Sequence, residues 1–397
     1  MATAPVDLDE LQITGAARLN YFGASPSADG KRNLLGATLQ AKAQPKMSEQ
    51  LDANVEARFS LPDIGSRDGY PAKAELLEGY ATGHFTGVDL RVGKQIVAWG
   101  RADGINPTDT LTPRNYTVAL PFEEDQRFGI WGARFTAPVG PLTLTLFGSP
   151  DFQPHKVPLR VGEVAIRIRR PGNSVGDFKV GVKLDRSGGA VDWSVSYSHG
   201  PGLLPSVRDA GSVLELGYDR THVIGADFAR TLGRFGVRGE IAYTIPARQD
   251  GIDPNAKRSW LFFVLGVDRT FQESLNVNVQ MLVRWMPGHK DPANASDPAV
   301  RRAISINELI RGQEGEFSPG LTFRVSNLWR HDTLRAEVFG ALNAKRGDMY
   351  VRPYVSYDIT DQLRASLGAN LYAGPRTAPF GALRPANGLF AELRRGF

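Results

Sequence analysis

Apolar and polar residues alternate along most of this chain. In the segment LDANVEARF, every second residue from Leu51 to Phe59 is apolar, and the residues between them are polar or charged. Side chains of a β-strand point alternately to two faces, so this period of two predicts strands with one apolar and one hydrated face. The pattern recurs at residues 11–21, 191–197, 275–285, 334–342 and 363–371. Because no convincing amphipathic helix longer than two turns accompanies it, the sequence predicts an all-β protein.

The connections between these segments alternate in length. Short ones lie at residues 45–50, 86–87, 138–141, 186–189, 232–235, 271–274, 329–332 and 359–362, and long polar ones lie at 99–126, 150–176, 201–219, 246–258, 287–316 and 374–386. This alternation is typical of antiparallel strands that run up and down between two unlike ends. Each strand has about 9–13 residues, enough to cross a bilayer when tilted. We therefore expect a transmembrane up-and-down β-barrel of about 18 strands, or 16 as the alternative count, with short periplasmic turns and long extracellular loops. We expect one barrel domain over residues 1–397.

A soluble sandwich or propeller would also show alternation. Two features disfavour it: the polar face is charged on almost every strand, and no second apolar face is available to fill a soluble core. In a membrane barrel the apolar face meets lipid and the polar face lines the lumen. Aromatic side chains favour the headgroup level. We accordingly expect girdles from Trp99, Trp260 and Trp285 at the loop end, and from Trp329 and Tyr357 at the turn end.

Composition narrows the class further. No apolar run approaches the ~18–20 residues of a membrane-spanning helix. The chain has no cysteine, and its net charge of +5 comes from Lys and Arg scattered over the whole length, so we expect no nucleic-acid partner. The first ten residues, MATAPVDLDE, have neither the basic nor the apolar region of a secretory signal. For an exported protein we therefore expect a signal peptide that is not part of this sequence.

The last residues suggest an assembly signal. In GLFAELRRGF, Leu389, Ala391, Leu393 and Phe397 share one face. This ending resembles the C-terminal strand of Gram-negative outer-membrane proteins, which implies that residues 388–397 close the barrel and that the barrel-assembly machinery reads Phe397. Arg395 departs from the pattern, because an apolar residue is usual there.

Longer segments carry a further resemblance. Residues 92–116 and 380–397 are similar to porin-like families of the alginate-export or uncharacterised barrel type. The resemblance implies that the barrel lies in an outer membrane and is surrounded by lipopolysaccharide. It also leaves open whether the protein forms a homotrimer or binds an envelope partner protein.

The long connection at residues 99–126 is the candidate constriction. In the porins that this chain resembles, the equivalent loop often folds inward and narrows the pore. Its charged residues include Arg101, Asp103, Asp109, Arg114, Glu123 and Glu124. Opposed charges across a narrow aqueous gap select solutes by charge and size. The alternative is a surface loop held by its own ion pairs.

Basic side chains slightly outnumber acidic ones on the predicted lumen face. They include Arg58, Arg91, Arg134, Arg284, Arg335 and Arg364. This excess predicts a weak preference for anionic solutes. The alternative is that these charges pair across strands and hold the wall together.

The sequence thus favours a channel for passive passage of small hydrophilic solutes or of a polymer. Two alternatives stay open: a structural barrel that binds an envelope partner, and a membrane-embedded lipid hydrolase. For the hydrolase, GNSVG at 172–176 fits G-x-S-x-G but lies in a loop, and His199 or His222 would supply the base. The six histidines show no metal-binding spacing, so we predict no metal, no cofactor and no enzyme activity.

Overall fold

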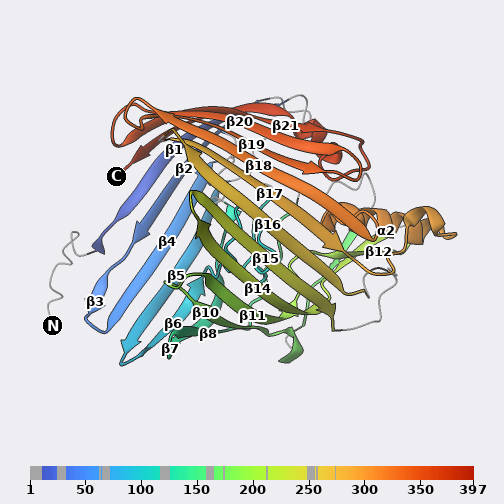
Figure 1. Cartoon of the computed structure of the whole chain (residues 1–397), viewed down its shortest axis with the longest axis horizontal. Coiled ribbons are helices and arrows are strands. Elements are labelled where there is room, and N and C mark those ends of the chain that lie inside the picture. Colours follow the sequence, from blue (N-terminus) through green and yellow to red (C-terminus); the bar gives the residue numbers. More distant parts are fainter. Residues whose placement is uncertain are drawn as a thin grey trace.

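The computed structural model describes residues 11–24, 33–61, 64, 72–116, 126–157, 165–172, 175–211, 213–247, 255, 258–272 and 274–397. Within these ranges, eighteen long strands and the short strand β3 (Lys46–Ser48) form one 19-stranded sheet. Its last strand pairs with its first, so the sheet is a closed barrel (Figure 1). Neighbouring strands are antiparallel throughout, as the alternating connections predict.

The long strands follow one another around the barrel in chain order. Their bounds are β1 (Thr14–Ala24), β2 (Asn33–Ala43), β4 (Leu51–Leu61), β5 (Lys73–Phe85), β6 (Val88–Gln95), β7 (Ile130–Val139), β8 (Leu142–Ser149), β10 (Lys179–Arg186), β11 (Asp192–Pro201), β14 (Arg220–Leu232), β15 (Phe235–Pro246), β16 (Trp260–Phe271), β17 (Leu275–Trp285), β18 (Phe317–Trp329), β19 (Leu334–Asn343), β20 (Asp348–Asp358), β21 (Leu363–Ala373) and β22 (Gly388–Gly396). The up-and-down barrel and the count of about eighteen are confirmed for the described residues.

The two faces of the wall are inverted relative to a soluble protein. On β17, Met281 is 44% exposed on the outer face, whereas Gln280 beside it is 1% exposed on the inner face. Other outward residues such as Val55, Leu367 and Leu371 are exposed as well, while polar side chains such as Asn54 and Asn278 are buried. An exposed apolar belt of this extent marks a bilayer-facing wall. The prediction of a lipid-facing apolar side and a lumen-facing polar side is therefore confirmed.

Smaller elements gather at the loop end, opposite the end that carries the C-terminus (Figure 1). A second sheet contains β9 (Ala165–Arg169), β12 (Ser206–Asp209) and β13 (Val213–Gly217). Short 3-10 helices are η2 (Val175–Asp177), η3 (Pro292–Asn294) and η4 (Gly381–Ala386), and the one longer helix of the described residues is α2 (Pro298–Arg311). Among the described residues, no helix combines the length and apolar character needed to cross a membrane.

Helix α2 corrects the expectation that the chain has no helix longer than two turns, because it has 14 residues. The Asp297 side chain caps its first turn by accepting a hydrogen bond from the Ala299 N–H, and Gly312 ends it with a positive φ of 60°. Ile306 and Ile310 pack against β12 and β13. Those start and stop signals were readable in the sequence, but they lie within a long polar connection.

Two further expectations need correction. The connection between β19 and β20 covers residues 344–347 only, so short and long connections do not alternate strictly; Gly347, at φ 66°, closes this turn. The aromatic girdle is also smaller than predicted. Trp285, Trp329 and Tyr357 are exposed at strand ends, but Trp99 is 6% exposed inside the barrel. Trp260 shares the inward face of β16, and the Arg311 guanidinium lies 5.9 Å from its ring centre.

The barrel closes where the terminal residue meets β1. The Gly15 N–H donates a hydrogen bond to the Phe397 carbonyl oxygen at 2.9 Å, and the Phe397 N–H donates to the Gly15 carbonyl oxygen at 3.1 Å. A Cβ atom on Gly15 would lie 2.4 Å from the Phe397 ring and 2.4 Å from the Gln40 carbonyl oxygen. The absence of a side chain at Gly15 is therefore what allows the terminal ring to lie over β1.

This packing predicts that Gly15→Val destabilises the barrel by about 1–3 kcal/mol, because the new side chain must displace the ring or the strand. Unfolding of the detergent-refolded protein in denaturant would measure the change. Gly148→Val is the matched control: Gly148 also lies on the outer face, where an added Cβ atom meets nothing within 4 Å. Equal stability of the two variants would contradict the role assigned to Gly15.

Candidate functional site

The loop between β6 and β7 turns into the lumen. Its residues Val97, Trp99 and Leu111 form an apolar cluster with Ile130 and Phe147, which project inward from the wall. On β10, a Cβ atom at Gly181 would lie 2.7 Å from the Trp99 ring. Trp99 therefore packs against the inner wall, and this is why it is absent from the girdle.

A buried carboxylate holds the middle of this loop. Glu240 on β15 is 2% exposed. It accepts hydrogen bonds from the Thr108 N–H at 2.7 Å, the Thr108 hydroxyl at 2.8 Å, the Ala102 N–H at 3.2 Å and the Asn106 side-chain amide at 3.3 Å. The backbone of Gly100, which has a φ of 94°, lies against this carboxylate, because a Cβ atom added there would be 2.4 Å from it. Loop and wall are thus joined by charge-assisted hydrogen bonds.

Asp103 anchors the loop to the opposite wall of the barrel. One of its carboxylate oxygens accepts from the Arg238 guanidinium at 2.9 Å, the Asn278 side-chain amide at 2.6 Å and the Arg324 guanidinium at 3.3 Å. These partners lie on β15, β17 and β18, across the ring from β6 and β7. The loop therefore crosses the lumen.

Arg101 fixes the same loop to a third part of the wall. Its guanidinium is paired with Asp227 on β14 and, at 2.7 Å, with Asp185 on β10. Burial opposes the charge of Arg101, but the hydrogen bonds to these two carboxylates raise its pKa above the ordinary value. Arg101 therefore keeps its charge and holds the loop to β10 and β14.

Asp109 and Arg114 brace the loop internally. The Asp109 carboxylate, 2% exposed, lies 2.9 Å from the Arg114 guanidinium and 2.8 Å from the Arg127 guanidinium. The Arg114 N–H donates to His155 Nδ1 at 2.9 Å. Burial, with Lys179 and Arg114 nearby, lowers the pKa of His155 to about 3, so the ring is neutral and keeps its acceptor at physiological pH. Glu123 and Glu124 lie outside the described residues.

The six wall arginines predicted for the lumen all occupy inward positions, but they are spread around the barrel. Arg58 donates to Gln40 at 3.2 Å, and Arg91 donates to Thr82 at 3.1 Å and lies next to Arg134 across β6 and β7. Arg284 lies 4.0 Å from the Phe262 ring centre, Arg335 is paired with Glu337 at 2.6 Å, and Arg364 is paired with Asp358 at 3.0 Å. The loop contacts described above do not include these six residues.

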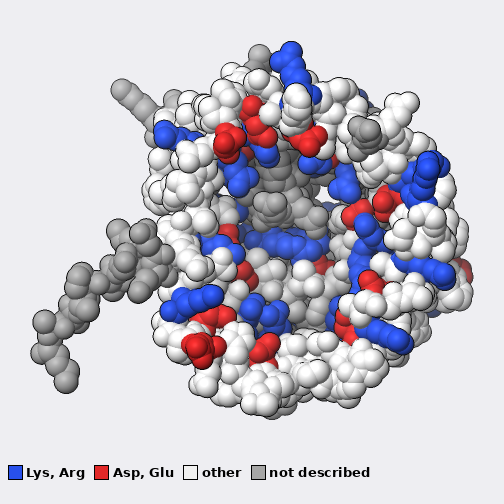
Figure 2. Space-filling view, turned by 60° about the vertical axis from the view of Figure 1, so that its left-hand side comes forward, with Lys and Arg blue, Asp and Glu red and all other residues white. Residues whose placement is uncertain are grey.

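Like charges meet at the barrel seam. Arg394 on β22 is the cross-strand neighbour of Arg364 on β21 and of Arg18 on β1. Figure 2 brings the turn end forward and shows a hollow ringed by basic and acidic side chains. The polar contacts of the loop described above lie on β10–β18, whereas on β21–β7 arginines neighbour one another and the inward acids Glu56 and Glu78 are cross-strand neighbours.

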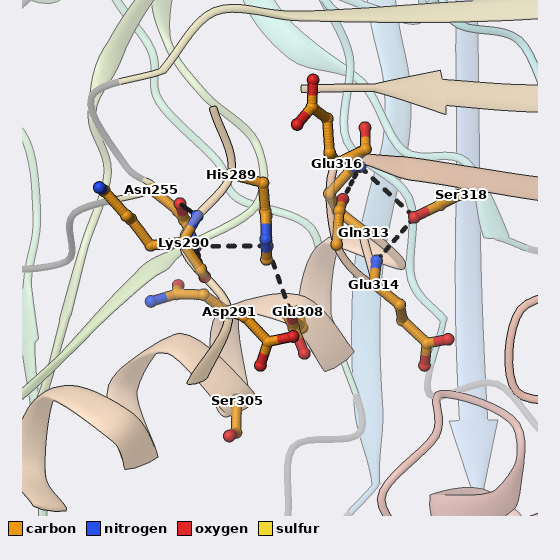
Figure 3. Close-up of polar contacts among 12 residues, drawn as sticks. Asn255, His289, Lys290, Asp291, Ser305, Glu308, Gln313, Glu314, Glu316 and Ser318 are labelled. Carbon is orange, nitrogen blue, oxygen red and sulfur yellow. Dashed lines mark hydrogen bonds and ion pairs between the residues drawn. The ribbon is translucent and has the colours of Figure 1, made fainter. Parts of the chain in front are cut away.

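The loop end is held together by a polar network (Figure 3). His289 Nε2 lies 3.2 Å from Glu308 Oε1 on α2, and Asn255 exchanges hydrogen bonds with the backbone of Lys290 at 2.7 and 2.8 Å. The Glu314 N–H donates to the Ser318 hydroxyl at 2.8 Å. Burial raises the pKa of Glu314. These contacts fix α2 and its flanking segments above the barrel wall.

The residues proposed for a hydrolase do not form a catalytic arrangement within the described structure. The His199 and His222 rings are stacked with centres 4.4 Å apart on the outer face, and the Tyr197 hydroxyl lies 2.8 Å from His222 Nδ1. Asp177 is paired with Arg220 at 2.9 Å, and the serine of the GNSVG segment lies outside the described residues. Nothing in this geometry favours the hydrolase.

Solved structures with the same architecture were found by comparison. They include a BenF-like porin from Pseudomonas fluorescens Pf-5 (9% identity, 98% of each chain covered, TM-score 0.59), OccAB4 of Acinetobacter baumannii (8%, 97% of each chain, 0.58) and OccK11 (OpdR) of Pseudomonas aeruginosa (12%, 97% of this chain and 95% of that one, 0.55). The fold is that of the outer-membrane porins. Neither a protein-family model nor a curated protein matches the sequence.

Sequence analysis of this porin fold missed the wall partners of the loop. The alternation of β14 and β15 puts Asp227 and Glu240 on the lumen face, but nothing in the sequence connects them with the loop. Glu240 and Thr108 are 132 residues apart, and Arg101 and Asp227 are 126 apart, so no local pattern links them. Only the closed barrel shows which inward-facing acids pair with the polar residues of the loop.

The four hydrogen bonds to Glu240 predict that Glu240→Gln loosens the loop of this porin fold. Because a hydrogen bond to a charged group contributes about 1.5–3 kcal/mol, the amides of residues 102–108 should exchange with solvent about tenfold faster or more. Hydrogen exchange with mass spectrometry would measure this. Glu337→Gln, an inward position on β19 paired with Arg335, is the control and should leave these amides unchanged. Unchanged exchange in Glu240→Gln would contradict the anchoring role.

Proposed function

We propose that this chain is an outer-membrane channel for the passive passage of small hydrophilic solutes. The observation that carries the proposal is the loop after β6, which crosses a polar lumen inside a barrel with a bilayer-facing apolar belt. The porin fold supports it, since the neighbours named above are porins. A loop fixed to the wall by Glu240, Asp103 and Arg101 narrows the water-filled path without blocking the whole cross-section.

We propose that solutes pass along the side of the lumen formed by β21, β22, β1, β2 and β4–β7. The opposite side holds the loop, whose Asp103 is neutralised by Arg238 and Arg324. Asp109 and Arg114, being paired and buried, act as internal braces in this proposal. Asp103 and Asp109, the loop acids among the described residues, are therefore compensated, while arginines neighbour one another on the free side. This arrangement supports a preference for anionic solutes.

We infer the cellular location of the protein from the bilayer-facing belt and the porin fold. A Gram-negative outer membrane would place the tight turns in the periplasm and α2 outside the cell. In that setting, residues 1–397 form one barrel domain, Phe397 is read by the barrel-assembly machinery, and lipopolysaccharide surrounds the outer leaflet. We also propose that the barrel can assemble as a homotrimer. Its solute can be a polymer, as in the alginate-export type.

Conductance tests the channel directly. The purified protein in a planar bilayer should give a steady ohmic current. Removal of the part of the loop that crosses the lumen, residues 101–110, should raise single-channel conductance, because it removes the obstruction. Absence of current from folded protein would overturn the channel, and a stoichiometric protein that co-purifies would then favour the partner-binding barrel.

The reversal potential in a salt gradient tests selectivity. We expect anion preference, and we expect the double variant Arg91→Gln, Arg134→Gln to reduce it, because both guanidinium groups lie on the free side of the lumen. Arg234→Gln is the control, since Arg234 is exposed in a tight turn outside the lumen. A cation preference of the unmodified protein would refute this part of the proposal.

A further inference from the structure

A groove on the outer wall lies beside the seam of the barrel. It has a volume of about 680 Å³ and an apolar lining on β22, β1, β2 and β4. At one end it reaches Thr360 and Gln362 of a tight turn, and at the other it reaches Leu61, the last residue of β4. The groove therefore runs from the turn rim into the bilayer-facing belt.

The strand register explains why the wall is hollow here. Ala17 on β1 lies between Arg395 on β22 and Leu39 on β2. In the next outward row, Ala37 on β2 lies between Leu19 and Leu61. Two methyl side chains thus stand among longer ones in adjoining rows, so the floor of the groove is formed by small residues and its edges by large apolar ones. A narrow apolar depression of this kind fits a hydrocarbon chain.

The turn end of the groove carries a positive charge. Arg395 is exposed and lies one residue inside the end of β22. Tyr357 lies one residue inside the end of β20, and its exposed ring marks the headgroup level of the girdle. The guanidinium of Arg395 is therefore at the depth of lipid phosphates. In the part of the chain that the structure describes, no ion pair joins Arg395 to a carboxylate.

We propose that this groove is a binding site for a phospholipid, with the phosphate on Arg395 and one acyl chain along Ala17 and Ala37. A second copy of the chain fits less well, because a protein contact would bury the Arg395 charge, which no carboxylate of its own described chain neutralises. A phosphate supplies that countercharge while its acyl chain fills the depression. The site also explains why Arg395 interrupts the apolar face of the terminal strand.

Lipid retention tests the site. Protein purified in mild detergent would be incubated with dioleoyl phosphatidylglycerol and examined by native mass spectrometry. We expect one retained lipid, weakened about fivefold in Arg395→Gln, as the loss of one basic contact with an anionic headgroup implies. Ala37→Leu should also release the lipid by filling the groove. Because leucine is apolar and faces lipid, this variant should fold, which heat-modifiable gel mobility would verify.

Arg394→Gln is the matched control, because Arg394 is the next residue of the same strand and faces the lumen. It should retain the lipid as the unmodified protein does. Retention unchanged in both Arg395→Gln and Ala37→Leu would overturn the proposal, as would a lipid-free dimer that Ala37→Leu dissociates, since a second copy would then occupy the groove. The test does not depend on conductance, so it stands or falls separately from the proposed channel.

Discussion

The structure depends on the need to satisfy every backbone N–H and C=O group inside hydrocarbon. An open sheet would leave two unpaired edges there, and each buried unpaired group is expensive. The pairing of β22 with β1 removes both edges. It constrains the sequence most strongly at Gly15, because the terminal aromatic ring lies where a side chain would otherwise be. Everything inside the barrel, including the inward loop, relies on this closure.

Closure creates an interior where polar groups are shielded from lipid and can be used for positioning. The loop after β6 is fixed by apolar packing near its start, by Glu240 and Arg101 in its middle, and by Asp103 on the far wall. These contacts come from strands distant in sequence. The loop is therefore fixed to the wall at several points around the lumen.

Sequence reasoning was most successful where the physics is local. The alternation that places Leu51 and Val55 outside and Asn54 and Arg58 inside follows from strand geometry alone. The girdle prediction is wrong for Trp99, because a residue just beyond a strand end has no fixed face, and for Trp260, because this residue lies at a strand end but on the inward face. The loop anchors could not be predicted, since they join residues separated by more than a hundred positions.

The arginines at the seam have a consequence for biogenesis. Arg364, Arg394 and Arg18 occupy one row across β21, β22 and β1, so the strands of the seam bring positive charges together when they meet. Pairing of the two strands at the seam is therefore opposed by electrostatic repulsion until counterions, Asp358 beside Arg364 or Glu392, two residues before Arg394, compensate it. The rate of barrel closure should accordingly depend on ionic strength.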